Sequence, residues 1–69
     1  MKLSARNQIP AKVINVVHGE ATANVELDAC GSRLVASITV EAANELKLVP
    51  GSEVVAIIKA SDVIVAVAD

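Results

Sequence analysis

The sequence contains no phenylalanine, tryptophan or tyrosine, and it has one cysteine and one histidine. A lone Cys30 excludes an internal disulfide framework and a Cys-x-x-Cys metal or redox pair. His18 lies in a predicted turn with no acid and nucleophile in a pattern typical of catalysis, so we expect no enzymatic activity. Without aromatic side chains, the chain also lacks the stacking platforms that hold nucleic-acid bases on small barrels.

Long apolar runs and an excess of positive charge are also missing. No run approaches the roughly 18 apolar residues of a membrane span, and Met1 leads directly into Lys2 and a polar segment. Six basic residues, scattered along the chain, face eight acidic ones, giving a net charge of -2. This balance disfavours binding to nucleic acid or an anionic membrane, so we expect a cytoplasmic protein with neither partner.

The apolar side chains that are present are mostly small. Apolar residues make up 54% of the 69 positions, but twelve are alanine and twelve are valine. Such a core buries little area, whereas ordering the chain costs on the order of 1.5 kcal/mol per residue. We therefore expect residues 1–69 to form a single domain that gains further burial by assembling into an oligomer.

Short runs of β-branched residues between turn formers predict a mainly β fold. The first two candidate strands cover residues 3–9 and 11–17, separated by a break or bend at Pro10. Because a proline cannot donate to a sheet ladder, we expect Pro10 to mark a sheet edge or a bulge. Strict alternation predicts the next strand at 22–29, which pairs as a hairpin with 32–40. Gly31 supplies the tight turn of this hairpin.

The second half predicts one helix and two more strands. In "VEAANELKL" the residues Ala42, Ala43, Leu46 and Leu48 have near-helical spacing, and Thr39 is a candidate N-cap. "EVVAIIKA" and "DVIVAVA" predict two buried strands after a Pro-Gly turn. Five to six strands with one short helix between the third and fourth is the order of a small OB-like Greek-key β-barrel.

Two polar clusters stand out at the ends of predicted strands. The segment "LSARNQIP" brings Ser4, Arg6 and Asn7 together, and the corner "KASD" contains Lys59 and Ser61. Guanidinium, ammonium, hydroxyl and backbone N–H groups together can surround a tetrahedral oxyanion without adding negative charge. Residue types alone make this signal weak, because serine, arginine and lysine are common on ordinary surfaces.

Both clusters lie in segments that resemble the molbindins of the Mop family. "SARNQIPAKV" at 4–13 is similar to the Ser-Ala-Arg-Asn opening of that family. "ASITVEAANELKLVPGSEVVAIIKASDVIVAV" at 36–67 is similar to its second half, where an Ile-Thr strand end leads to a short helix, a Gly turn and a Lys-Ala-Ser/Thr corner. The resemblance covers essentially the whole chain and identifies it as a single Mop domain of the TOBE-like kind.

The resemblance implies a cytoplasmic store or buffer that binds molybdate or tungstate, with no pterin or other organic cofactor. The family forms hexamers, each a trimer of dimers, with the anions held between subunits and no metal coordinated directly by side chains. The matching positions imply Ser4 and Arg6 as donors and Lys59 as the charge partner. They also imply Ala60 through its backbone N–H and Ser61 through its N–H and hydroxyl, with Thr39 as a lesser candidate. The family has a second class of site near its three-fold axis, which matches no motif here, and the turn at 17–21 is our suggestion for it.

Two other functions remain open from the sequence. "ITVEAANELKLVPGSEV" at 38–54 also resembles the swapped-hairpin DNA-binding domains of AbrB-type regulators and antitoxins. Here Glu41 replaces the usual proline, and no basic arm is present to neutralise phosphates. Mop modules also resemble the C-terminal domains of molybdate-responsive regulators and molybdate-transporter ATPases, which leaves a sensing role open.

Overall fold

The structure, a computed structural model, describes residues 3–68 and is built on one antiparallel sheet. Its elements are β1 (Asn7–His18), β2 (Thr22–Ala29), β3 (Ser32–Thr39), α1 (Val40–Glu45), β4 (Glu53–Ile58) and the 3-10 helix η1 (Ala60–Asp62). The sheet order is β3-β2-β1-β4, so the fourth strand returns to lie beside the first. This is the Greek-key order, and it confirms the mainly β prediction.

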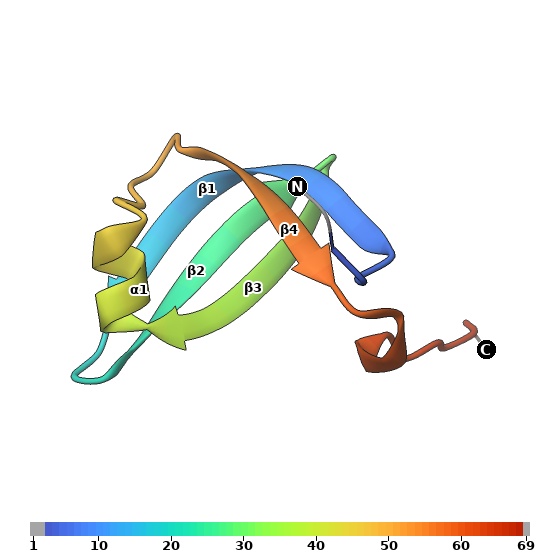
Figure 1. Ribbon diagram of the computed structural model, residues 1–69. Helices are drawn as coiled ribbons and strands as arrows, with labels where there is room; N and C mark the ends of the chain where they lie inside the picture. The colour runs from blue at the N-terminus through green and yellow to red at the C-terminus, as the bar shows by residue number, and fades with distance from the viewer. Residues whose placement is uncertain (1–2, 69) are drawn as a thin grey trace.

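The strands curve together so that their inner faces enclose a small apolar core (Figure 1). Val13 of β1 and Val25 and Leu27 of β2 form the buried centre. Alternate residues of β3 and β4 pack against this centre, because side chains on a strand point to opposite faces in turn. The packed residues include Leu34, Ala36, Ile38, Val54 and Ala56.

The hairpin of β2 and β3 forms as the sequence predicts. Its two strands pair from Thr22–Thr39 to Ala29–Ser32 without interruption. The turn consists of Cys30 and Gly31, with φ of 54° and 92°, and the Gly31 N–H donates to Asp28 Oδ1 at 2.9 Å. Two successive positive φ values match the twist of the strands, which is why a glycine is needed here.

The predicted break at Pro10 is wrong, because β1 is continuous from Asn7 to His18. Its first half pairs with β4, from Asn7–Ile58 to Lys12–Glu53, and its second half pairs with β2. Within residues 3–68, no strand pairs with the other edge of β1 over residues 7–11. A proline, which lacks the N–H, is tolerated at such an edge, so the edge position predicted for Pro10 is confirmed.

The helix α1 forms within the predicted segment 40–48, but it ends at Glu45, and a different set of its side chains is buried. Thr39 is its N-cap, with Oγ1 accepting a hydrogen bond from the Ala42 N–H at 3.0 Å. After Glu45 the chain leaves the helix through Lys47 at φ 53°, and the Leu48 N–H donates to the Ala43 carbonyl at 3.2 Å. Ala43 is buried, but Leu46 is exposed and does not join the predicted apolar face.

The prediction of a strand at 62–68 is wrong. Only the segment 53–58 becomes a strand, and the chain then forms η1 and an extended tail with no sheet partner within residues 3–68. The described residues thus hold four strands instead of five or six. Since β3 and β4 are the two edges of the sheet, the barrel is not closed by pairing within this one chain.

Candidate functional site

The fold brings the two polar clusters of the sequence together at one end of the sheet. The ladder between β1 and β4 ends with the pair Asn7 and Ile58. The Asn7 side chain adds a hydrogen bond from Nδ2 to the Ile58 carbonyl at 3.1 Å. Residues 4–6 and 59–61 therefore leave the sheet from adjacent positions, as the predicted site requires.

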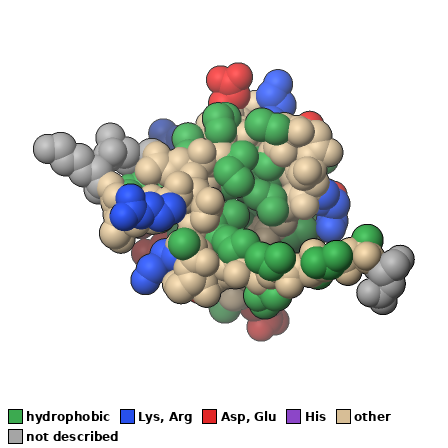
Figure 2. Space-filling view, turned by 90° about the vertical axis from the view of Figure 1, so that its right-hand side faces the viewer, with side chains coloured by type: hydrophobic (Ala, Val, Ile, Leu, Met, Phe, Trp, Pro, Cys, Tyr) green, Lys and Arg blue, Asp and Glu red, His purple; other side chains and the backbone are tan. Residues whose placement is uncertain are grey.

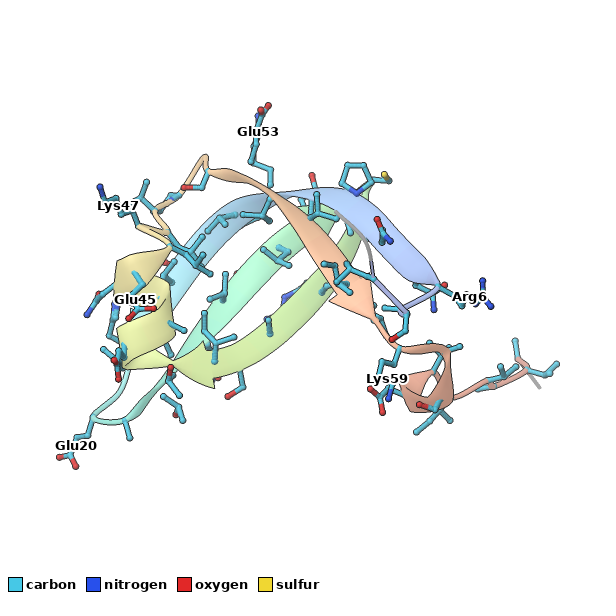
Figure 3. The ribbon with its side chains drawn as sticks, in the orientation of Figure 1. Arg6, Glu20, Glu45, Lys47, Glu53 and Lys59 are labelled. Carbon is cyan, nitrogen blue, oxygen red and sulfur yellow. The ribbon has the colours of Figure 1, made fainter. Side chains whose placement is uncertain are left out.

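The charged side chains of this end are open to solvent. Ser4, Arg6, Lys59 and Ser61 are all exposed. Figure 3 shows Arg6 and Lys59 at the same end of the molecule but pointing in different directions. One chain thus presents donors that do not enclose an ion between them.

The Lys59 corner has a local structure suited to donating hydrogen bonds. Lys59 is the N-cap of η1, and its carbonyl accepts from the Asp62 N–H at 2.9 Å. The first N–H groups of any helix lack partners within the helix, which leaves the backbone donors of Ala60 and Ser61 available. Asp62 lies in the same turn, so its carboxylate partly offsets the charge of Lys59.

Thr39 lies elsewhere. It ends β3 opposite Thr22, next to the turn after His18, whereas Asn7 is at the far end of β1. The Val40 N–H donates to the Ala21 carbonyl at 2.9 Å, which ties Thr39 to this turn. The structure therefore groups Thr39 with the predicted segment 17–21 and not with Arg6 and Lys59 of the same chain.

A large apolar groove, which the sequence did not predict, lies between the two edge strands. The β3–β4 groove has a volume of about 270 Å³ and only apolar lining residues. It includes Leu34, Ala36 and Ile38 from β3 and Val54, Ala56 and Ile58 from β4. Hydrophobic side chains gather across the middle of this side of the molecule, with Lys and Arg side chains at the margins (Figure 2).

The large apolar side chains with the highest exposed fractions in the described chain belong to the C-terminal tail. Ile64, Val65 and Val67 are 92%, 83% and 87% exposed. They belong to the apolar run that predicts a buried strand, and nothing within residues 3–68 covers them. An exposed apolar patch of this kind is typical of a surface that another chain buries.

Neither metal-ligand clusters nor membrane-spanning helices occur in the described residues. Over residues 3–68, no group of three or more His, Cys, Asp or Glu side chains is arranged to hold a metal ion. No helix in this part of the chain has the length and apolar character needed to cross a membrane.

Comparison with known proteins gives matches over nearly the whole chain. The sequence pattern described as the TOBE domain matches residues 3–65. A Haemophilus influenzae protein named "Probable molybdenum-pterin-binding protein" is 43% identical over 68 residues, covering 97% of this chain and 99% of its own.

Two solved structures share the fold. The molybdate-binding protein from Sporomusa ovata superimposes with a TM-score of 0.91 at 41% identity, covering 96% of this chain and 98% of its own. The cytoplasmic molybdate-binding protein ModG, in a form with molybdate bound, has a TM-score of 0.85 at 41% identity. That match covers 87% of this chain and 43% of the ModG chain.

Proposed function

Because the chain belongs to the TOBE domain family, we propose that it binds molybdate or tungstate and acts as a store or buffer of these oxyanions. The observation that carries this proposal is the Asn7–Ile58 pair, which sets the Ser-Ala-Arg-Asn segment beside the Lys-Ala-Ser corner. The two segments supply the donors that a tetrahedral dianion requires. The ligand is the oxyanion itself, without a pterin or other organic cofactor.

Each predicted residue has a distinct role in this proposal. Arg6 offers a planar fork of N–H donors, and Lys59 supplies a compact positive charge. The Ser4 hydroxyl, the Ala60 N–H, and the N–H and hydroxyl of Ser61 complete the shell. Since Thr39 lies at the other end of the sheet, it contributes only to a different site or from another copy of the chain.

The sites lie between copies of the chain in this proposal. Arg6 and Lys59 of one chain point apart, so a second copy is needed to enclose an ion (Figure 3). The exposed tail at 63–68 and the β3–β4 groove support assembly, because each is an apolar surface that the other could cover in a second copy. We expect a hexamer made as a trimer of dimers, as the family resemblance implies.

The proposal also covers the domain organisation, the lack of enzymatic activity and the cellular location of the protein. We treat residues 1–69 as a single domain of this kind, without enzymatic activity. A cytoplasmic location is supported by the similarity to ModG, which is described as cytoplasmic. The swapped-hairpin DNA-binding function is not carried further, because the comparisons place the chain in the TOBE domain family.

Titration calorimetry with molybdate tests the function and the site together. We expect Arg6→Ala and Lys59→Ala each to weaken binding by at least about tenfold, because each removes a charge-assisted donor. The matched control is Arg33→Ala, since Arg33 is an exposed β3 residue paired with Glu26. The Arg33→Ala variant should bind molybdate with the same affinity as the wild type.

Two results would count against the proposal in different ways. Wild-type protein that binds neither molybdate nor tungstate contradicts the function. Unchanged affinity in both the Arg6 and Lys59 variants contradicts the site while leaving the function standing.

A further inference from the structure

Asn7 makes a contact that the roles assigned to Ser4, Arg6 and Lys59 do not explain. It is half-buried at the first position of β1, and its Nδ2 donates to the carbonyl of Ile58, 51 residues away in the chain. Ile58 is the last residue of β4, directly before Lys59. The bond therefore joins the residue that follows one donor segment, 4–6, to the residue that precedes the other, 59–61.

The contact lies at the point where ordinary sheet pairing stops. Asn7 and Ile58 are the last partners of the β1–β4 ladder. Within residues 3–68, no other side-chain hydrogen bond connects the N-terminal segment with the end of β4. Residues 4–6 and 59–61 lie beyond this last pair, and nearly all of their side chains are exposed.

The chemistry of Asn7 favours an indirect role over direct contact with an anion. One N–H of its amide is committed to Ile58, and its Oδ1 is an acceptor that would repel an oxyanion. A bond that holds two donor segments at a fixed separation lowers the entropy lost when both order around a ligand. Asn7 can therefore raise affinity without touching the ion.

From this geometry we infer that Asn7 is a positioning residue for the oxyanion site, an inference that rests on the proposed function. It fixes the spacing between the Ser4–Arg6 segment and the Lys59–Ser61 corner through the Ile58 carbonyl. The spacing between donors decides which anion fits, so Asn7 acts on the affinity for molybdate through the backbone of β4.

The test compares molybdate binding by Asn7→Ala, Asn7→Gln and Asn15→Ala with the wild type. Asn7→Ala should bind about fivefold to tenfold more weakly, the effect of losing one hydrogen bond. Asn7→Gln keeps an amide donor and should recover at least half of that loss on a logarithmic scale. Asn15→Ala is the matched control, because Asn15 is on the same strand and, within residues 3–68, its side chain accepts a hydrogen bond only from the adjacent Val16 N–H. This variant should bind molybdate as the wild type does.

Hydrogen exchange without ligand supplies a readout that does not depend on binding. In Asn7→Ala the amides of Asp62 and Val63, which donate to the carbonyls of Lys59 and Ala60, should exchange faster, while the β2–β3 hairpin keeps its protection. If the wild type binds molybdate, and Asn7→Ala binds it equally well with unchanged exchange at Asp62 and Val63, the inference alone is overturned. Loss of protection throughout the Asn7→Ala protein, not repaired in Asn7→Gln, also overturns it. A wild type that does not bind molybdate instead contradicts the proposed function.

Discussion

Arg6 and Lys59 concentrate positive charge at one end of a chain whose net charge is -2 (Figure 3). The residue types of the candidate site could be predicted from the sequence, because they occur in two short motifs at the spacing of a known family. The contact between Asn7 and Ile58 could not, since it joins positions 51 residues apart and depends on the order of the strands. Thr39 matched its motif but lies at the other end of the sheet.

The nature of these donors predicts poor competition by phosphate. Most donors of the proposed shell are guanidinium, ammonium and backbone N–H groups, which have no acceptor for the proton that hydrogen phosphate carries near neutral pH, and the two serine hydroxyls are expected to donate to the anion. Molybdate carries no such proton at that pH, so all its oxygens can accept hydrogen bonds. We expect a tenfold excess of phosphate to leave the apparent Kd for molybdate nearly unchanged in competition calorimetry. Equal competition by the two ions would indicate a general anion site.

Replacing Lys47 with glycine should make the folded protein more stable. Its φ of 53° is in the left-handed region, and the residue follows the end of α1, where glycine is preferred. Lys47→Gly should raise the free energy of unfolding by about 0.5–1 kcal/mol, after the greater freedom of glycine in the unfolded chain is subtracted. Lys47→Ala removes the same charge but keeps the Cβ atom, so it should bring no comparable gain. Urea denaturation at one protomer concentration measures both, and equal stability of the two variants would contradict the explanation.

The strands and the helix whose formation depends on nearby residues could be predicted from the sequence. The β2–β3 hairpin follows from alternation and the Gly31 turn, and α1 follows from the Thr39 cap. Pro10 misled the prediction because its effect depends on which edge of β1 has a neighbour, a property of sheet order. The segment 62–68 has the pattern of a strand but pairs with no strand within residues 3–68, and we expect a second copy of the chain to supply its partner.

We therefore predict that the oligomer forms only if the exposed side chains of the tail at 63–68 are apolar. Val65 and Val67 lie two residues apart, so in an extended strand they face the same side. The double change Val65→Asp with Val67→Asp should dissociate the oligomer at micromolar concentration, because each buried unpaired carboxylate costs several kcal/mol. Light scattering coupled to size exclusion measures the mass.

A control for the tail variant must also add negative charge. Asn24→Asp does so at an exposed position on β2 with nearly the same side-chain shape, and it should keep the wild-type mass. An unchanged mass in the Val65 and Val67 double variant would show that the tail does not take part in assembly.

The whole molecule combines a small core with a large exposed apolar surface. Buried side chains are mostly alanine and valine, and the largest fully buried one is Val13. The groove between β3 and β4 and the tail at 63–68 remain open in one chain. A dianion that binds only the assembled form would stabilise that form by mass action, so ion binding and assembly should be coupled.

Native mass spectrometry with and without molybdate tests the central claim most directly, because a single spectrum reports both the number of chains and the number of bound ions. We predict a hexamer that gains several molybdate masses, with a greater share of hexamer when the ion is present. A monomer or dimer whose mass does not change on adding molybdate would contradict both the binding function and the location of the sites between copies of the chain.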